Sequence, residues 1–122
     1  MVDIDAIVPA LGAGAISRTV TSGRLLSTDR PRWWFIGTVA LSGAWAGTAT
    51  IDVEVRAGVL GVSLIGADES APWAEREVGV GHHTIVLDLA RPEVRPKNIL
   101  MRSCDPRDLP VVLIVKSIKV TP

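Results

Sequence analysis

Hydrophobic and polar residues alternate along much of this chain. Between positions 50 and 56 the sequence runs Thr-Ile-Asp-Val-Glu-Val-Arg, in which every second residue is aliphatic and β-branched. Successive side chains of a strand point to opposite faces, so Ile51, Val53 and Val55 are predicted to face a core while Asp52 faces water. A period of two therefore indicates a half-buried strand in this segment.

Similar rows of inward-facing residues recur elsewhere and predict further strands. The rows are Phe35, Gly37, Val39 and Leu41; Leu60, Val62 and Leu64; and Ile85, Leu87 and Leu89. The segment 111–120 is aliphatic at first and then alternates, and a β-bulge near Val115 would reconcile its two halves. Shorter strands are expected over 15–21, 74–80 and 98–103.

Glycine and proline divide the chain into short windows, which suit strands better than long helices. The sequence contains 11 Gly and 8 Pro. The Ala57-Gly58 step between two alternating segments is typical of a β-hairpin turn. These signals together predict an all-β fold, an antiparallel β-sandwich of jelly-roll type with about eight strands.

Length and charge narrow the classes of function. The 122 residues fit a single domain over 1–122, with a leading segment, 1–31, that is poorly assigned. Lys and Arg together number 13, as do Asp and Glu. A nucleic-acid binder normally carries a basic excess, so nucleic acid is not an expected partner. With neither a membrane-spanning apolar run nor a secretory signal, a cytoplasmic protein is expected, or an extracellular one if a signal was removed.

The residues that usually carry catalysis do not form a recognisable constellation. The single cysteine, Cys104, excludes an internal disulfide and a multi-cysteine metal site. His82 and His83 are neighbours, so on a strand they point to opposite faces and are poorly placed to chelate one ion together. Carboxylates such as Asp52 and Glu54 fit solvated surface charges better than a glycosidase pair. The sequence therefore predicts no enzyme.

The aromatic residues are concentrated in tryptophan, with four Trp, one Phe and no Tyr. Sugar rings bind against flat apolar surfaces, which indole rings provide. Trp45, in a glycine-rich segment, and Trp73, at the end of an acidic loop, are candidate ligand contacts, with packing as the alternative. Trp33 and Trp34 are adjacent, so one is expected to fill the core while the other covers its edge.

Polar residues on predicted strand faces complete the candidate binding site. Arg18 lies between aliphatic neighbours on one strand face, Asp88 shares a face with Val86, and Arg102 shares a face with Asn98. A guanidinium and a carboxylate on neighbouring strands can form a structural ion pair or bind vicinal hydroxyls. Both interpretations stay open at the level of the sequence.

The order of these segments resembles that of jelly-roll carbohydrate-binding modules of the galactose-binding-like type. The resemblance rests on the segment 50–68, an alternating strand, a Gly turn and a strand ending in an acidic loop, followed by 82–89, 98–103 and a closing strand over 111–120. It implies a non-catalytic carbohydrate-recognition or accessory module that binds an oligosaccharide or polysaccharide. Such modules are often appended to glycan-active enzymes, and related domains accompany bacterial methyltransferases and glycosyltransferases.

Two questions stay open. Modules of this kind often hold one structural calcium ion, which carboxylates could bind at Asp3 and Asp5 or at Asp68 and Glu69. No EF-hand pattern is present, so no cofactor is expected, with calcium as the alternative. The alternative function is a protein-interaction or oligomerisation β-sandwich without a sugar site, which would make a homo-oligomer the partner. A large exposed apolar patch would favour that alternative.

Overall fold

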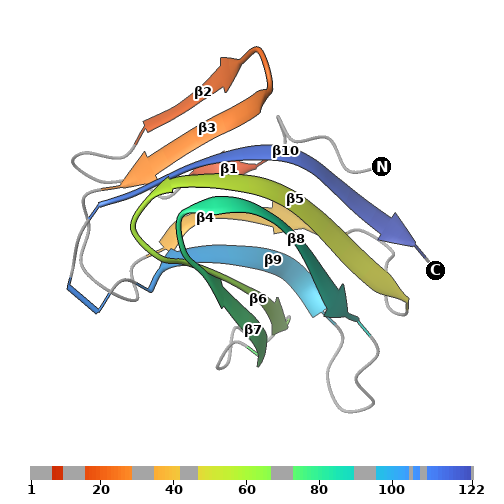
Figure 1. The fold of residues 1–122 in the computed structure, drawn as a ribbon. Helices are drawn as coiled ribbons and strands as arrows, with labels where there is room; N and C mark the ends of the chain where they lie inside the picture. Colours follow the sequence, from red (N-terminus) through yellow and green to blue (C-terminus); the bar gives the residue numbers. More distant parts are fainter. Residues whose placement is uncertain are drawn as a thin grey trace.

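The computed structural model describes residues 7–9, 16–28, 35–41, 47–66, 73–89, 96–104, 106–107 and 110–121. These residues form strands and turns and include no helix, hence none that could cross a membrane. The strands in Figure 1 are β1 (Val8–Pro9), β2 (Ile16–Val20), β3 (Gly23–Thr28), β4 (Phe35–Ala40), β5 (Thr48–Ala57), β6 (Leu60–Gly66), β7 (Trp73–Val78), β8 (Gly81–Asp88), β9 (Pro96–Ser103) and β10 (Val111–Thr121).

The strands form two antiparallel sheets that pack face to face. The first sheet has the strand order β2-β3-β10-β5-β8, and the second has the order β1-β4-β9-β6-β7. Only two pairs of consecutive strands, β2–β3 and β6–β7, are also neighbours in a sheet. All the other connections between described strands cross from one sheet to the other. This arrangement confirms the predicted jelly-roll β-sandwich, with ten described strands where about eight were expected.

The alternating segments form strands in the predicted orientation. In β5, Ile51, Val53 and Val55 are buried in the core, while Arg56 is exposed. The corresponding rows of β6 and β8 are buried as well, and so are Val39 and Leu41 from the row in and after β4. The pairing of β10 with β5 shifts register between Val115 and Ser117, which confirms the predicted bulge.

The hairpin predicted at Ala57-Gly58 is wrong. A tight turn is present, with Gly58 at a φ of 76°, but β5 belongs to the first sheet and β6 to the second. The two strands therefore face each other across the core instead of pairing. A local turn signal indicates a reversal of the chain and does not show which sheet receives the next strand.

Two strands in the leading segment were not predicted, β1 and β3. In β3, Leu25 and Leu26 are adjacent, and this breaks the period of two on which the prediction depended. Leu26 faces the core, whereas Leu25 is on the other face and only partly buried. The preceding Gly23 is required because a Cβ at this position would overlap the backbone carbonyl of Val115 in β10.

Strand β6 of the second sheet is buried on both of its faces. Every residue of β6 is buried, on the outer face as well as on the core face. Leu60, Val62 and Leu64 belong to the core cluster, whereas Ser63 and Ile65 alternate with them and point outward. The outer face of this sheet is therefore partly covered, unlike an ordinary solvated sheet face.

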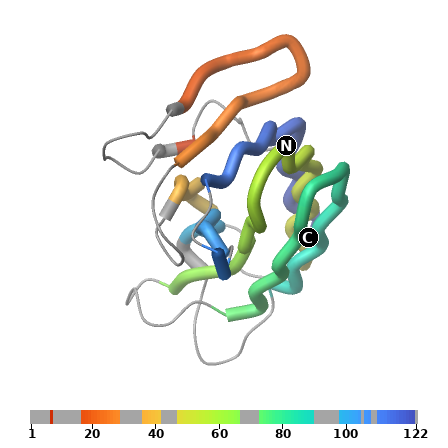
Figure 2. Tube along the Cα trace, turned by 60° about the vertical axis from the view of Figure 1, so that its left-hand side comes forward, coloured from red at the N-terminus to blue at the C-terminus, as the bar shows by residue number. Residues whose placement is uncertain are grey.

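The sandwich is curved. Figure 1 shows β5, β8 and β10 arching over β9, which bends in the same direction. The outer face of the second sheet consequently lies on the inner side of the curve. The β2–β3 hairpin extends from one end of the molecule, as Figure 2 shows from a second direction.

Candidate functional site

The candidate site lies on the outer face of the second sheet, where two of the residues expected from the sequence lie. Arg102 in β9 and Glu77 in β7 both pair with Gly61 in β6, so the three form one row across the sheet. Since the neighbours of Gly61 in β6 point into the core, this row points outward. Asn98 shares the outer side of β9 with Arg102. We call this surface, formed by Glu75, Glu77, Asn98, Arg102 and Cys104, the Arg102 face.

A bidentate ion pair crosses this face. Arg102 Nε donates to Glu75 Oε2 at 2.7 Å, and a second guanidinium nitrogen, Nη2, donates to Glu75 Oε1 at 2.9 Å. The two side chains are only 18% and 20% exposed. Such a fork-to-carboxylate contact fixes both groups in one plane and is stronger than a neutral hydrogen bond. Of the two interpretations that the sequence left open, the structure thus contains the ion pair. The pair is only partially buried, so its edges remain in contact with solvent.

Gly61 makes room for this ion pair. The pair spans from β9 to β7 and passes over the intervening strand β6. A Cβ at Gly61 would overlap the Sγ of Cys104 and would lie 3.2 Å from Glu75 Oε2. The close approach of these side chains to the backbone therefore requires glycine in the middle of a strand.

The ion pair and its surroundings shift two pKa values. The hydrogen bond from Arg102 to Glu75 raises the pKa of the guanidinium, which stays charged. Burial, together with the negative charges of Glu75 and Glu77, raises the pKa of the Cys104 thiol to about 11. The Cys104 Sγ lies 3.9 Å from Glu75 Oε1, to which it donates weakly. A buried thiol that is protonated at neutral pH packs as a small hydrophobic group.

Trp73 does not lie in a loop, contrary to the sequence-based expectation. It begins strand β7, pairs with Leu64 and packs against the core cluster. A bulge in β7 explains this orientation, because three positions separate Trp73 from Arg76 while only two separate their partners Leu64 and Val62. The additional residue, with Ala74 at a φ of 56°, brings Trp73 to the core side.

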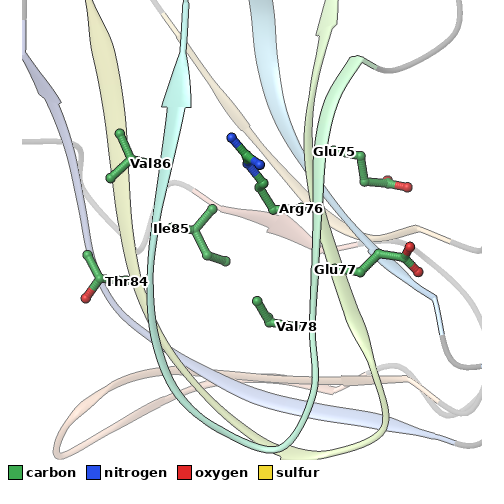
Figure 3. A pocket seen from close by; sticks show the side chains of 7 residues that line it. All are labelled: Glu75, Arg76, Glu77, Val78, Thr84, Ile85 and Val86. Atoms are coloured by element: carbon green, nitrogen blue, oxygen red, sulfur yellow. The ribbon is translucent and has the colours of Figure 1, made fainter.

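A second surface feature is an open groove of about 530 Å³ between the edge strands β7 and β8. Its lining residues are Glu75, Arg76, Glu77, Val78, Thr84, Ile85 and Val86. Figure 3 shows the side chains of Arg76, Val78 and Ile85 between the two strands. Glu75 and Glu77 point to the other side of β7 in Figure 3, where Arg102 binds the Glu75 carboxylate. We call this feature the β7–β8 groove.

The remaining candidates do not join the Arg102 face. Arg18 is exposed on β2, and Asp88 is exposed on β8, at opposite edges of the first sheet. Four strand spacings of about 4.8 Å separate these edges, so the two side chains lie roughly 19 Å apart across the sheet. Trp45, the other expected sugar contact, lies outside the described residues, as do Trp33 and Trp34.

The two histidines lie on opposite faces of β8, as expected. His82 is exposed and contacts the Asp52 carboxylate on the outer face of the first sheet, and His83 Nε2 lies 2.7 Å from the carbonyl oxygen of Gly79. In the part of the chain that the structure describes, no group of three His, Cys, Asp or Glu residues could hold a metal ion. The carboxylates considered for calcium, at positions 3, 5, 68 and 69, lie outside that part.

Two residues of these surfaces were not predicted, Glu75 and Arg76. The signal was present in the sequence, because Glu75, Arg76 and Glu77 are consecutive charges within a predicted strand. Alternation requires that at least one charge of such a triplet points to each face of the sheet. One charge of β7 therefore had to point toward the core side, and the structure shows that this residue is Arg76.

Comparison with solved structures finds the same fold in family 29 carbohydrate-binding modules. A variant of CBM29-2 has a TM-score of 0.65 and 14% sequence identity, over 95% of this chain and 89% of that one. A variant complexed with cellulohexaose has a TM-score of 0.61 and 15% identity, over 93% and 85% of the two chains. Another, complexed with mannohexaose, has a TM-score of 0.62 and 14% identity, over 93% and 86%.

At this level of identity the similarity shows a shared jelly-roll fold. No protein-family model matches the sequence, and no curated protein matches it. The function must therefore be argued from the surfaces of this chain.

Proposed function

We propose that this chain is a non-catalytic carbohydrate-recognition module whose ligand binds on the Arg102 face. The observation that carries the proposal is the planar ion pair between Arg102 and Glu75, held on the outer face of a sheet with its edges in solvent. Guanidinium and carboxylate groups in fixed planes match the spacing of vicinal hydroxyls. The Asn98 side chain, on the same side of β9, adds an amide that both donates and accepts hydrogen bonds.

The fold supports the same proposal. The structures that share it are carbohydrate-binding modules, some of them complexed with hexasaccharides. In this chain, Trp45 is the proposed stacking platform for the sugar ring. The proposal also includes that the module is of the galactose-binding-like type and that it serves as an accessory domain of a bacterial enzyme. The interaction-domain alternative receives less support. Among the described residues, the large hydrophobic side chains left exposed are Val80 and Val86, which fall short of a typical interface patch.

Calorimetric titration with soluble hexasaccharides of glucose and mannose tests the proposal. Asn98→Ala removes the amide without touching the ion pair and is expected to weaken binding on the order of tenfold. Arg102→Lys keeps the charge but loses the fork, and we expect a loss of similar size. Lys119→Ala, which removes an exposed side chain from the outer face of the first sheet, is the matched control and should leave affinity unchanged.

Two results would overturn the proposal. One is the absence of binding across a broad panel of α- and β-linked glycans by a folded protein. The other is a sugar interaction that Lys119→Ala weakens as much as Asn98→Ala does, since the ligand would then lie on the first sheet.

A further inference from the structure

The β7–β8 groove contains a positive charge that the Arg102 face does not use. Arg76 pairs across the sheet with the core residue Val62, which places it on the core side of β7 at the open edge of the sandwich. Its guanidinium extends into the groove beside Val78 and Ile85 (Figure 3). Arg76 is exposed at this edge, so its guanidinium is accessible to a ligand and needs no carboxylate partner to stay charged.

No such partner is found for Arg76 within the described residues. The ion pairs there join Arg56 to Glu54, His82 to Asp52 and Arg102 to Glu75. The two glutamates that flank Arg76 in β7 turn toward the opposite face, and the carboxylate of Glu75 is bound by Arg102. The groove therefore offers a guanidinium fork to an anion from outside.

The walls of the groove suit a ligand that is both polar and aliphatic. Val78 and Ile85 provide apolar surface near the guanidinium, whereas the side chains of Thr84 and Val86 point to the outer face of β8, away from Arg76 (Figure 3). Both β7 and β8 end their sheets, so the backbone groups on their free edges can accept and donate hydrogen bonds. A volume of about 530 Å³ falls within the range of small-molecule sites.

We propose that the β7–β8 groove binds the carboxylate of an acidic sugar, a uronate residue, through the guanidinium of Arg76. This inference rests on the proposed carbohydrate-binding function and names the class of glycan. The planar carboxylate accepts two parallel hydrogen bonds from the fork, the C–H groups of the ring lie on Val78 and Ile85, and the ring hydroxyls meet the free strand edges.

The test compares each acidic glycan with its own neutral form. Hexamers of galacturonate, glucuronate and mannuronate are titrated into the protein alongside the same hexamers after reduction of their carboxyl groups to alcohols. The unreduced form of at least one hexamer is expected to bind on the order of tenfold more tightly, and this preference should weaken as salt is added. Arg76→Gln should abolish the preference, and Arg76→Lys should retain only part of it.

Arg56→Gln is the matched control, because it removes another exposed arginine, from the outer face of the first sheet. It should keep the full preference for the acidic form. Arg76 is exposed, so its variants should melt at the wild-type temperature. Equal binding of acidic and reduced hexamers, or an unchanged preference in Arg76→Gln, would overturn the inference.

The outcomes separate this inference from the proposed function. If acidic and reduced hexamers bind equally and Asn98→Ala weakens both, the Arg102 face is the site and the inference about Arg76 fails. If acidic hexamers bind through Arg76 alone, with no effect of Asn98→Ala, the inference holds and the assignment to the Arg102 face fails. If only an acidic peptide binds at Arg76, or nothing binds at all, the inference is overturned.

Discussion

The two sheets share one core but differ on their outer faces. On the first sheet, charged groups pair in solvent, as in the 3.2 Å contact between Arg56 and Glu54, whose side chains are 58% and 36% exposed. On the second sheet, the pair between Arg102 and Glu75 is about four-fifths buried, and Ser63 and Leu100 beside it are fully buried. The outer face of the first sheet is thus solvated, whereas the outer face of the second sheet carries largely buried polar groups that bind one another.

This difference indicates where binding is organised. Exposed ion pairs contribute little energy and leave their side chains free to move, whereas a largely buried bidentate pair holds polar groups in fixed positions. Fixed polar groups lose little conformational entropy when a ligand arrives. The second sheet therefore has the preorganisation that a binding surface needs, and the first sheet does not.

The largest expected effect is in the shared core. Val53→Asp places a carboxylate without a partner on the core face of β5 and should lower the free energy of unfolding on the order of 4 kcal/mol. Val86→Asp makes the same change on the exposed outer face of β8 and should cost less than about 1 kcal/mol. Urea denaturation measures both. Similar losses in the two variants would show that the assigned strand faces are wrong.

The second prediction concerns the close packing on the Arg102 face. Gly61→Ala should cost about 2 kcal/mol, because the new methyl group overlaps Cys104 Sγ. Gly79→Ala, where a Cβ meets nothing within 4 Å, should change stability by less than about 0.5 kcal/mol. Adding Cys104→Ala to Gly61→Ala should recover a large part of the loss. A double variant that is less stable than Gly61→Ala would refute this explanation.

A third comparison sets the two ion pairs against each other. Arg102→Met leaves the Glu75 carboxylate largely buried without its partner and should cost about 2 kcal/mol. Arg56→Met breaks an exposed pair and should cost less than about 0.5 kcal/mol. Thermal or chemical denaturation in parallel distinguishes the two. Equal costs would remove the energetic distinction between the sheets.

The last of these predictions concerns pH. Because the folded-state pKa of Cys104 is raised from 9.0 to about 11, the neutral thiol favours the folded state. This contribution is fully present below about pH 9 and is lost as the pH rises toward about 11. Wild type should therefore lose stability relative to Cys104→Ala over this interval, as measured by urea denaturation at several pH values. Parallel pH profiles would contradict the raised pKa.

The sequence predicted the parts of the fold in which one face is buried. Strands such as β5 and β8 alternate strictly because their outer faces are solvated, so the period of two is visible. The prediction from alternation failed at β3, where Leu25 and Leu26 are adjacent. It also failed at the Ala57-Gly58 turn, because local turn chemistry does not show whether the next strand pairs or crosses to the other sheet.

The candidate site was only partly predictable. Arg102 and Asn98 were placed on one strand face, since that requires only alternation along β9. Glu75 was missed as the partner because it lies two strands away, across β6, and such register is set by the whole sheet. Trp73 was assigned to a loop because the bulge that turns it toward the core has no clear signal in the sequence.

The most direct test of the central claim is an NMR titration of the labelled protein with the hexasaccharide panel, followed through its backbone amides. The account predicts shifts that cluster on the second sheet, at Asn98, Arg102 and Glu77, while Thr50 and Lys119 on the outer face of the first sheet stay unchanged. Shifts centred on Thr50 and Lys119, or none across the panel, would contradict it.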